Sequence, residues 1–388
     1  MTISTPFVFD LLTPNRIVFG WGRRRELGDM IASLGTRCFM VLGSRTLLQH
    51  GLFDAIRNTL DVADITTNTP EVISREPIVS DVDKAVQRAR EWKADVILGI
   101  GGGAALDLAK AIAALIPQTM VASVSDYLEG VGRELSLTEH PLPTLLMPTT
   151  AGTGSEVTKN AVISSPQAQF KKSLRAESML TDIALVDPEL TITTSPNVTL
   201  HSGMDALTQC VESYLSCRAT VLTRPLALEG FRHAWTALPL AIQNPGSRPA
   251  REAMSYAALL SGISLANSGL GMAHGVAAAL GIHASVPHGL ACAVMLPVAL
   301  QVNLECARDG LIQLDAARTN VNTGSAESLI EAIITLSRSM GLPERLRDLD
   351  VKRDQLAAIA ASSGGNSMRG NPREIKDAEL RDILHHAW

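Results

Sequence analysis

The sequence contains a long window without ordinary charge, from Ala253 to Leu304, in which no Asp, Glu, Lys or Arg occurs. Glycines and polar residues interrupt it and leave no run of about 18 apolar residues, so it predicts buried core helices rather than membrane spans. Burying two of its histidines, His274 and His288, is costly unless they find partners. A metal ion with Asp205 as an anionic third ligand would provide one. Hydrogen bonds to backbone carbonyls would also satisfy the two imidazoles, and the spacing alone leaves open whether they bind a metal or such carbonyls.

Length and composition predict a globular protein with more than one core. The chain has 388 residues, of which 46% are hydrophobic, and its net charge is −5 without a basic cluster, which argues against a nucleic-acid partner. The five cysteines are odd in number and form no CxxC pair, so we expect reduced thiols in a cytoplasmic protein. The N-terminus has no basic segment followed by an apolar run, so no signal peptide is expected.

The first half of the chain alternates strand and helix patterns. The predicted strands lie at 17–19, 38–42, 96–98, 144–147 and 183–186. The predicted helices between them lie at 47–60, at 73–92 and after the glycines at 101–103. This alternation predicts a parallel sheet with helices on both faces, in a domain of residues 1–188. Long helical periods then predict an all-helical domain over residues 189–388.

Three consecutive glycines, Gly101, Gly102 and Gly103, join a predicted strand to the next helix. Without Cβ atoms these residues let backbone N–H groups approach a ligand, and the helix directs its positive end at an anion there. A pyrophosphate fits this position, and Asp107 follows on the helix as a further candidate for cofactor binding. The spacing is not GxGxxG, so this is not the ordinary dinucleotide fingerprint, and a plain tight turn would look the same.

A second loop, rich in hydroxyl groups, follows the strand at 144–147 and runs from Thr149 to Thr158. Its side chains are suited to bind a ribose or a carboxamide, although a solvated loop has a similar composition. Ligands of open α/β sheets bind at the carboxyl ends of the strands. Two such loops after successive parallel strands therefore favour a nucleotide site.

Five motifs in this order resemble the iron-containing (group III) alcohol dehydrogenase family: GGGAALDLAK, PTTAGTGSEVT, VDPELT, GMDALTQCVESY and HGVAAALGIHASVPHG. The resemblance implies a dinucleotide-binding α/β domain, a helical metal-binding domain and a cleft between them. It implies that NAD or NADP and a metal ion serve the interconversion of a small alcohol and its aldehyde or ketone. Family habit also implies a homo-oligomer, such as a dimer.

The resemblance assigns roles to individual residues. The implied metal ligands are Asp205, His274 and His288. The implied cofactor-binding residues are Gly101, Gly102, Gly103, Thr149, Thr150, Thr158 and Lys172.

Two departures from the family pattern concern the metal site. Gln209 stands where the family has a histidine, four residues after the ligand aspartate, and its neutral carbonyl oxygen is a weaker ligand or none. We therefore expect a weakly bound Fe²⁺ or Zn²⁺, with the site better suited to Zn²⁺. Ala278 replaces a further family histidine, which leaves His283 or His201 as candidates for a proton relay.

A third departure concerns the cofactor. Ser44 stands where NAD-specific members carry an aspartate that bonds the adenosine ribose, and Arg45 follows it. A serine removes the repulsion of a 2′-phosphate, and the arginine offers that phosphate a charged partner. We therefore expect NADP(H), with NAD(H) tolerated. The alternative is that Arg45 is only a solvated surface residue.

Other functions stay open from the sequence. The altered ligand set is compatible with a metal-independent carbonyl reductase of the maleylacetate-reductase type, with a catalytically inactive nucleotide-binding relative, or with a lyase-type relative similar to dehydroquinate synthase. The candidate positions for substrate specificity are the segment 125–128, the loop around Asn160, Arg369 and Arg373. Either arginine in the site would indicate an anionic substrate, whereas a surface position would carry no such meaning.

Overall fold

The computed structural model describes residues 8–43, 51–119, 123–321 and 323–388. The chain forms two compact units. The sheet unit comprises Thr13–Ser195 and Pro245–Ser255, and the helical unit comprises the segment ending at Leu12, Pro196–Asn244 and Tyr256–Trp388. The domain boundary near residue 188 stays a prediction.

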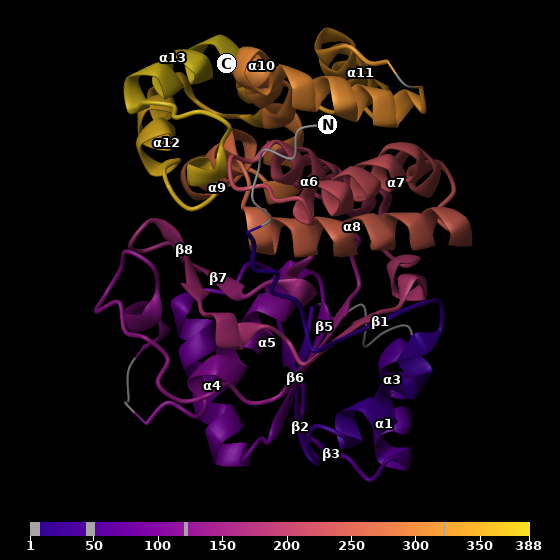
Figure 1. Cartoon of the computed structure of the whole chain (residues 1–388). Coiled ribbons are helices and arrows are strands. Elements are labelled where there is room, and N and C mark those ends of the chain that lie inside the picture. The colour runs from indigo at the N-terminus through magenta and orange to yellow at the C-terminus, as the bar shows by residue number, and fades with distance from the viewer. Residues whose placement is uncertain (1–7, 44–50, 120–122, 322) are drawn as a thin grey trace. The chain divides into compact units, whose positions relative to one another are not determined.

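The sheet unit contains a seven-stranded sheet in the order β1-β9-β6-β5-β2-β3, with β4 also paired to β2 (Figure 1). All of its described pairings are parallel. The strands are β1 (Arg16–Phe19), β2 (Arg37–Leu42), β3 (Thr66–Thr67), β4 (Glu71–Val72), β5 (Val96–Gly101), β6 (Thr144–Pro148) and β9 (Ile183–Val186). The five predicted strands are all present, so the predicted parallel sheet is confirmed.

Helices cover both faces of this sheet, as Figure 1 shows. Successive side chains of a strand point to opposite faces, so Phe39 and Val41 of β2 join the core under α4 and α5, whereas Cys38 and Met40 join the core under α1 and α3. Burial on both faces is why these strands read as continuous apolar runs. Among the described residues, these helices are α1 (Leu27–Ala32), α3 (Leu52–Val62), α4 (Val79–Trp92) and α5 (Gly103–Leu115).

The structure corrects two predictions in this unit. The helix predicted over 73–92 begins at Val79, because Ile78 is extended and its N–H donates to the Asp81 side chain, which caps the helix. The loop predicted around Asn160 is an antiparallel hairpin of β7 (Asn160–Ser165) and β8 (Phe170–Arg175). Ser164 and Ser165 end β7, and Lys171, Lys172 and Ser173 interrupt β8, so neither strand shows the apolar run of a buried strand.

The described part of the helical unit contains helices and no strand. Its helices are α6 (Pro196–Leu215), α7 (Thr223–Gln243), α8 (Arg248–Ser268, shared with the sheet unit), α9 (Met272–Ala284), α10 (His288–Thr319), α11 (Ala326–Ser339), α12 (Leu356–Ser362) and α13 (Asp377–Ala387). Apolar residues of α9, α10, α12 and α13 form one core. The charge-free window lies in α8, α9 and the first half of α10, and the predicted helical character is confirmed.

By length and composition, α10 is apolar enough to cross a membrane, with a window of mean hydropathy 1.7. Helices α8 and α9 together pass the same test but are bent by 99°. Half of the α10 window is buried inside the protein, as in the core helix of a folded domain, so the length and composition of α10 are weak evidence for a membrane span.

Candidate metal centre

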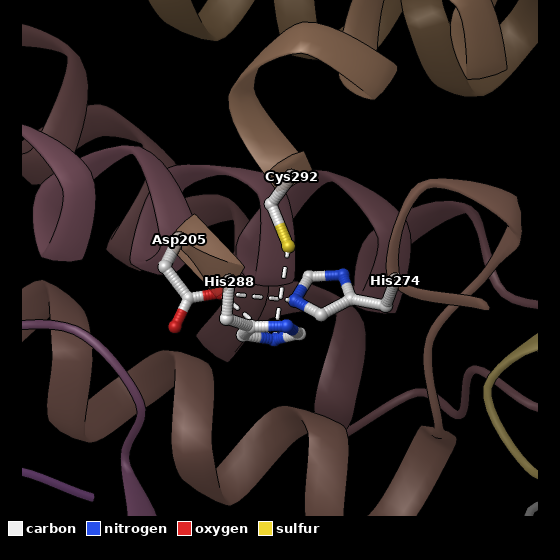
Figure 2. Close-up of side chains that lie close together, drawn as sticks. All are labelled: Asp205, His274, His288 and Cys292. Carbon is white, nitrogen blue, oxygen red and sulfur yellow. Dashed lines mark hydrogen bonds and ion pairs between the residues drawn. The ribbon is translucent and has the colours of Figure 1, made fainter. Parts of the chain in front are cut away.

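Four side chains with metal-binding atoms converge from three helices of the helical unit. Asp205 comes from α6, His274 from the first turn of α9, and His288 and Cys292 from the first two turns of α10. One ligand atom from each lies within 4.8 Å of the others, and Figure 2 shows the four side chains pointing toward a common centre. Three of these residues were predicted from the sequence, and Cys292 was not.

The distances between the ligand atoms are compatible with one bound ion. His274 Nε2 lies 3.1 Å and His288 Nε2 lies 3.8 Å from Asp205 Oδ1. Cys292 Sγ lies 3.8 Å from His288 Nε2. In a tetrahedral site with bonds of about 2.0–2.3 Å, ligand atoms are about 3.3–3.6 Å apart. A carboxylate, two imidazoles and a thiol at these separations therefore fit a divalent ion such as Zn²⁺.

Glu212 orients His274 from the far side of the imidazole ring. Its carboxylate accepts hydrogen bonds from the backbone N–H groups of Gly271, Ala273 and His274, at the start of α9, where such groups lack helical partners. Glu212 Oε2 also lies 2.7 Å from His274 Nδ1. Nδ1 is thereby committed to the carboxylate, and Nε2 faces Asp205. A carboxylate behind a ligand histidine is the usual support of a metal site.

Glu212 was not predicted from the sequence either. It stands seven residues after Asp205 on α6, so both carboxylates lie on one face of the same helix. This spacing within GMDALTQCVESY was the signal that could have identified it.

The ionisation of the cluster reflects its burial and its mixed charges. Burial raises the pKa of Asp205, but the hydrogen bond with His274 and the charge of His288 outweigh burial and lower it below its ordinary value. Burial lowers the pKa of His274, yet its interactions with Asp205, Cys292 and Glu212 raise it well above its ordinary value. Burial raises the pKa of Cys292 to about 11. The cluster therefore favours a positive charge at its centre.

Gln209 lies on α6, one turn after Asp205, and is buried. Its carbonyl oxygen accepts a hydrogen bond from Ser261 Oγ of α8 at 2.7 Å. That bond uses the oxygen through which Gln209 would bind a metal. Its role as a ligand stays a prediction.

His283 and His201, the two candidates for a proton relay, lie on different helices. His283 is in the last turn of α9, where its Nε2 lies 2.7 Å from Ser362 Oγ of α12. His201 is one turn before Asp205 on α6, and its backbone carbonyl packs against Gly289, the residue after His288. Burial lowers the pKa of His201. A relay role for either histidine stays a prediction.

In the sheet unit, the glycine turn and the hydroxyl-rich loop meet at the carboxyl ends of β5 and β6. The N–H of Thr149 donates to the carbonyl of Gly101 at 2.9 Å. A Cβ atom on Gly102 would lie 3.4 Å from the Thr150 hydroxyl, so the Thr150 side chain stands beside the turn. The N–H groups at the start of α5 and the hydroxyl of Thr150 are therefore neighbours, as a nucleotide site needs.

Asp107 and Thr158 take part in a buried network around Lys110, which is only 1% exposed. Lys110 Nζ donates to Thr158 Oγ1 at 2.9 Å and lies 3.1 Å from Asp107 Oδ1. Asp107 Oδ2 accepts the N–H of Val162 at 3.0 Å. These bonds fasten the hydroxyl-rich loop and β7 to α5. Contact of Asp107 or Thr158 with a cofactor stays a prediction.

The remaining candidates for cofactor or substrate binding lie in other elements of the two units. Lys172 lies in β8, with its ammonium group near Gly130. The Arg373 guanidinium forms an ion pair with Glu379, and Arg369 is exposed. Residues 125–128 lie in and just after a 3-10 helix (Val124–Tyr127). Ser44 and Arg45 lie outside the described residues.

Known proteins match this chain along its whole length. The family model of "Iron-containing alcohol dehydrogenase" matches residues 14–188, and that of the "Fe-containing alcohol dehydrogenase family, C-terminal" matches residues 199–388. Long-chain-alcohol dehydrogenase 1 of Geobacillus thermodenitrificans (strain NG80-2) is 31% identical over 386 residues, which is 96% of each chain. The NADPH-dependent butanol dehydrogenase of Clostridium saccharobutylicum is 28% identical, again over 96% of each chain.

A solved structure of 1,3-propanediol oxidoreductase has a TM-score of 0.90 at 29% identity and covers 98% of this chain and 100% of its own. The sequence motifs, the fold and both family models agree. The chain belongs to the iron-containing alcohol dehydrogenase family, whose members are NAD(P)-dependent oxidoreductases of alcohols and aldehydes.

Proposed function

We propose that this chain interconverts a small alcohol and its aldehyde or ketone with the help of a divalent metal ion held by Asp205, His274 and His288. The observation that carries the proposal is the convergence of these side chains from α6, α9 and α10, with one atom of each within 4.8 Å of the others. Glu212 behind His274 supports the same reading, because such a carboxylate fixes the ring and the tautomer of a ligand histidine. Three ligands with this support suffice to bind an ion, although Gln209 replaces the histidine of the family pattern.

A bound divalent cation supplies a Lewis acid that polarises a carbonyl group and stabilises negative charge on an alcohol oxygen, while NAD(P)H supplies the hydride. Asp205 contributes the negative charge that draws a cation into a buried site. Glu212 keeps His274 Nε2 directed at Asp205. In the sheet unit, the N–H groups at Gly102 and Gly103 and the positive end of α5 would bind the pyrophosphate of the cofactor.

The experiment that tests this function compares metal-loaded and metal-stripped protein in the reduction of short aldehydes by NADPH. After removal of the metal with a chelator, we expect less than about a tenth of the initial rate, and recovery when one equivalent of Zn²⁺ or Fe²⁺ is added back. Full activity of the stripped protein would instead support a metal-independent reductase of the maleylacetate-reductase type.

We propose NADP(H) as the preferred cofactor, with NAD(H) tolerated, because Ser44 and Arg45 suit a 2′-phosphate. The similarity to an NADPH-dependent butanol dehydrogenase is in line with this preference. A hydrogen bond to a charged group contributes about 1.5–3 kcal/mol. Ser44→Asp replaces a hydroxyl by a carboxylate that repels the 2′-phosphate, so it should raise the KM for NADPH about 10- to 100-fold. The KM for NADH should stay constant or fall. An unchanged ratio of the two KM values would refute the assignment.

We further propose a cytoplasmic homo-oligomer. All five cysteines are free thiols, which suits a reducing compartment. Light scattering during size-exclusion chromatography tests the oligomer, and a mass of 41.3 kDa would identify a monomer.

A further inference from the structure

The thiol of Cys292 belongs to the cluster by position as well as by chemistry. It lies four residues after His288 on α10, so both side chains leave the same face of that helix. Cys292 is fully buried, and its Sγ is 3.8 Å from His288 Nε2. Figure 2 shows the sulfur directed at the centre that the two imidazoles and Asp205 share.

The other four cysteines differ from Cys292 in this respect. Among the described histidine, cysteine and acidic side chains, the group of four that could hold an ion includes Cys292 and no other cysteine. Cys210 is equally buried, but its sulfur lies against the carbonyl of Ala257. Cys306 lies further along α10, with its sulfur 3.2 Å from the carbonyl of Asn303. A buried thiol among two imidazoles and a carboxylate is therefore specific to position 292.

We propose that Cys292 is the fourth protein ligand of the metal centre, bound as a thiolate, beside Asp205, His274 and His288. This inference rests on the proposed function, since it requires a metal ion at Asp205, His274 and His288. On binding, the S–H bond breaks, a sulfur–metal bond forms and the proton leaves to solvent, with no change of oxidation state. Carboxylate and thiolate together then balance the charge of a divalent ion.

A thiolate changes which metal the site favours. Sulfur is a soft donor, and a set of two imidazoles, one carboxylate and one thiolate suits tetrahedral Zn²⁺ or Co²⁺ better than a set of hard ligands does. Sulfur and nitrogen ligands of one tetrahedral Zn²⁺ are about 3.5 Å apart, close to the 3.8 Å between Cys292 Sγ and His288 Nε2. The centre would thus be a zinc-type site within a family named for iron.

The test uses cobalt as a spectroscopic probe. Protein stripped of metal is loaded with Co²⁺, whose visible bands report binding itself and whose near-ultraviolet charge-transfer band reports a bound thiolate. We expect both signals in the unaltered protein and in the control Cys306→Ser, which changes a thiol on the same helix outside the cluster. Cys292→Ser and Cys292→Ala should lose the charge-transfer band and keep visible bands.

The outcomes separate this inference from the proposed function. Visible cobalt bands without a charge-transfer band in the unaltered protein would leave the metal centre in place and overturn the thiolate. A protein that binds no Co²⁺ and no Zn²⁺ would overturn both. If the Cys292 variants do not fold, X-ray absorption of the unaltered zinc protein decides: one sulfur at about 2.3 Å supports the ligand, and nitrogen and oxygen neighbours alone refute it.

Discussion

Replacing Glu212 by glutamine tests how the chain prepares His274 for a metal. One carboxylate oxygen, Oε1, accepts the N–H of Ala273 at 2.6 Å. The other, Oε2, faces the N–H of Gly271, the N–H of His274 and the ring atom Nδ1 of His274, at 3.1, 3.3 and 2.7 Å. Glutamine has nearly the same shape but offers one acceptor oxygen. Whichever way its amide turns, an NH₂ group meets a donor, and the negative charge at the start of α9 is lost.

The loss in free energy of unfolding caused by Glu212→Gln follows from these contacts. A buried N–H left without an acceptor costs about 1–3 kcal/mol, and loss of a negative charge at a helix N-terminus costs about 0.3–2 kcal/mol. Glu212→Gln should therefore reduce the free energy of unfolding of the metal-free protein by about 2–4 kcal/mol. Because the ring of His274 loses its anionic support, metal affinity should fall about 10- to 100-fold as well.

Two assays separate these effects. Urea unfolding of the metal-free protein measures the stability, and competition with a chromophoric chelator measures the affinity for Zn²⁺. Glu305→Gln is the matched control, since its side chain is 87% exposed, and it should leave both values unchanged. Loss of stability with unchanged Zn²⁺ affinity would show that Glu212 only caps α9, and unchanged stability would refute the hydrogen-bond arrangement itself.

Three further predictions test other parts of the account. Gln209→Ala should retain one metal ion per chain by elemental analysis, whereas loss of the ion would make Gln209 a ligand. A Cβ atom on Gly101 would lie 2.6 Å from a backbone atom, whereas one on Gly102 would lie 3.4 Å from its nearest neighbour. Gly101→Ala should therefore lower the thermal unfolding temperature, while Gly102→Ala should leave the fold intact and weaken NADPH binding in calorimetry. Unchanged NADPH binding by Gly102→Ala would show that the turn is only structural. Burial raises the pKa of Glu156 from 4.5 to about 7, so between these pH values the native chain holds a proton that the unfolded chain releases. The free energy of unfolding should therefore fall by about 3 kcal/mol as the pH rises from 4.5 to 7. Glu156→Gln should abolish this pH dependence in urea unfolding.

Much of the fold was predictable because burial leaves a strong mark on sequence. Strands such as β2 and β5 are covered on both faces and contain mainly apolar residues, and the glycine run marks the change from β5 to α5. The hairpin of β7 and β8 escaped prediction because Lys171 and Lys172 stand in a half-exposed strand. The start of α4 was misplaced because an apolar period continues through extended residues before Val79, and periodicity does not register the cap at Ile78.

The site was predictable only in part, for a related reason. Asp205, His274 and His288 stand out because charged or polar side chains are rare in their surroundings. Cys292 and Glu212 were missed because each matters through a helix-face relationship, four residues from His288 and seven from Asp205. The spacings are visible in the sequence, but the contact of Glu212 with His274 on α9 becomes apparent only when the neighbouring helices are known. The hydrogen bond between Gln209 and Ser261 joins α6 to α8, and a local sequence pattern does not predict such a contact between helices.

The most direct test of the central claim is anomalous X-ray diffraction from crystals of the active protein, recorded on both sides of the absorption edge of the metal it contains. We expect one strong anomalous peak per chain, about 2.0–2.3 Å from ligand atoms of Asp205, His274 and His288. Crystals of fully active protein without a peak among these three side chains would contradict it.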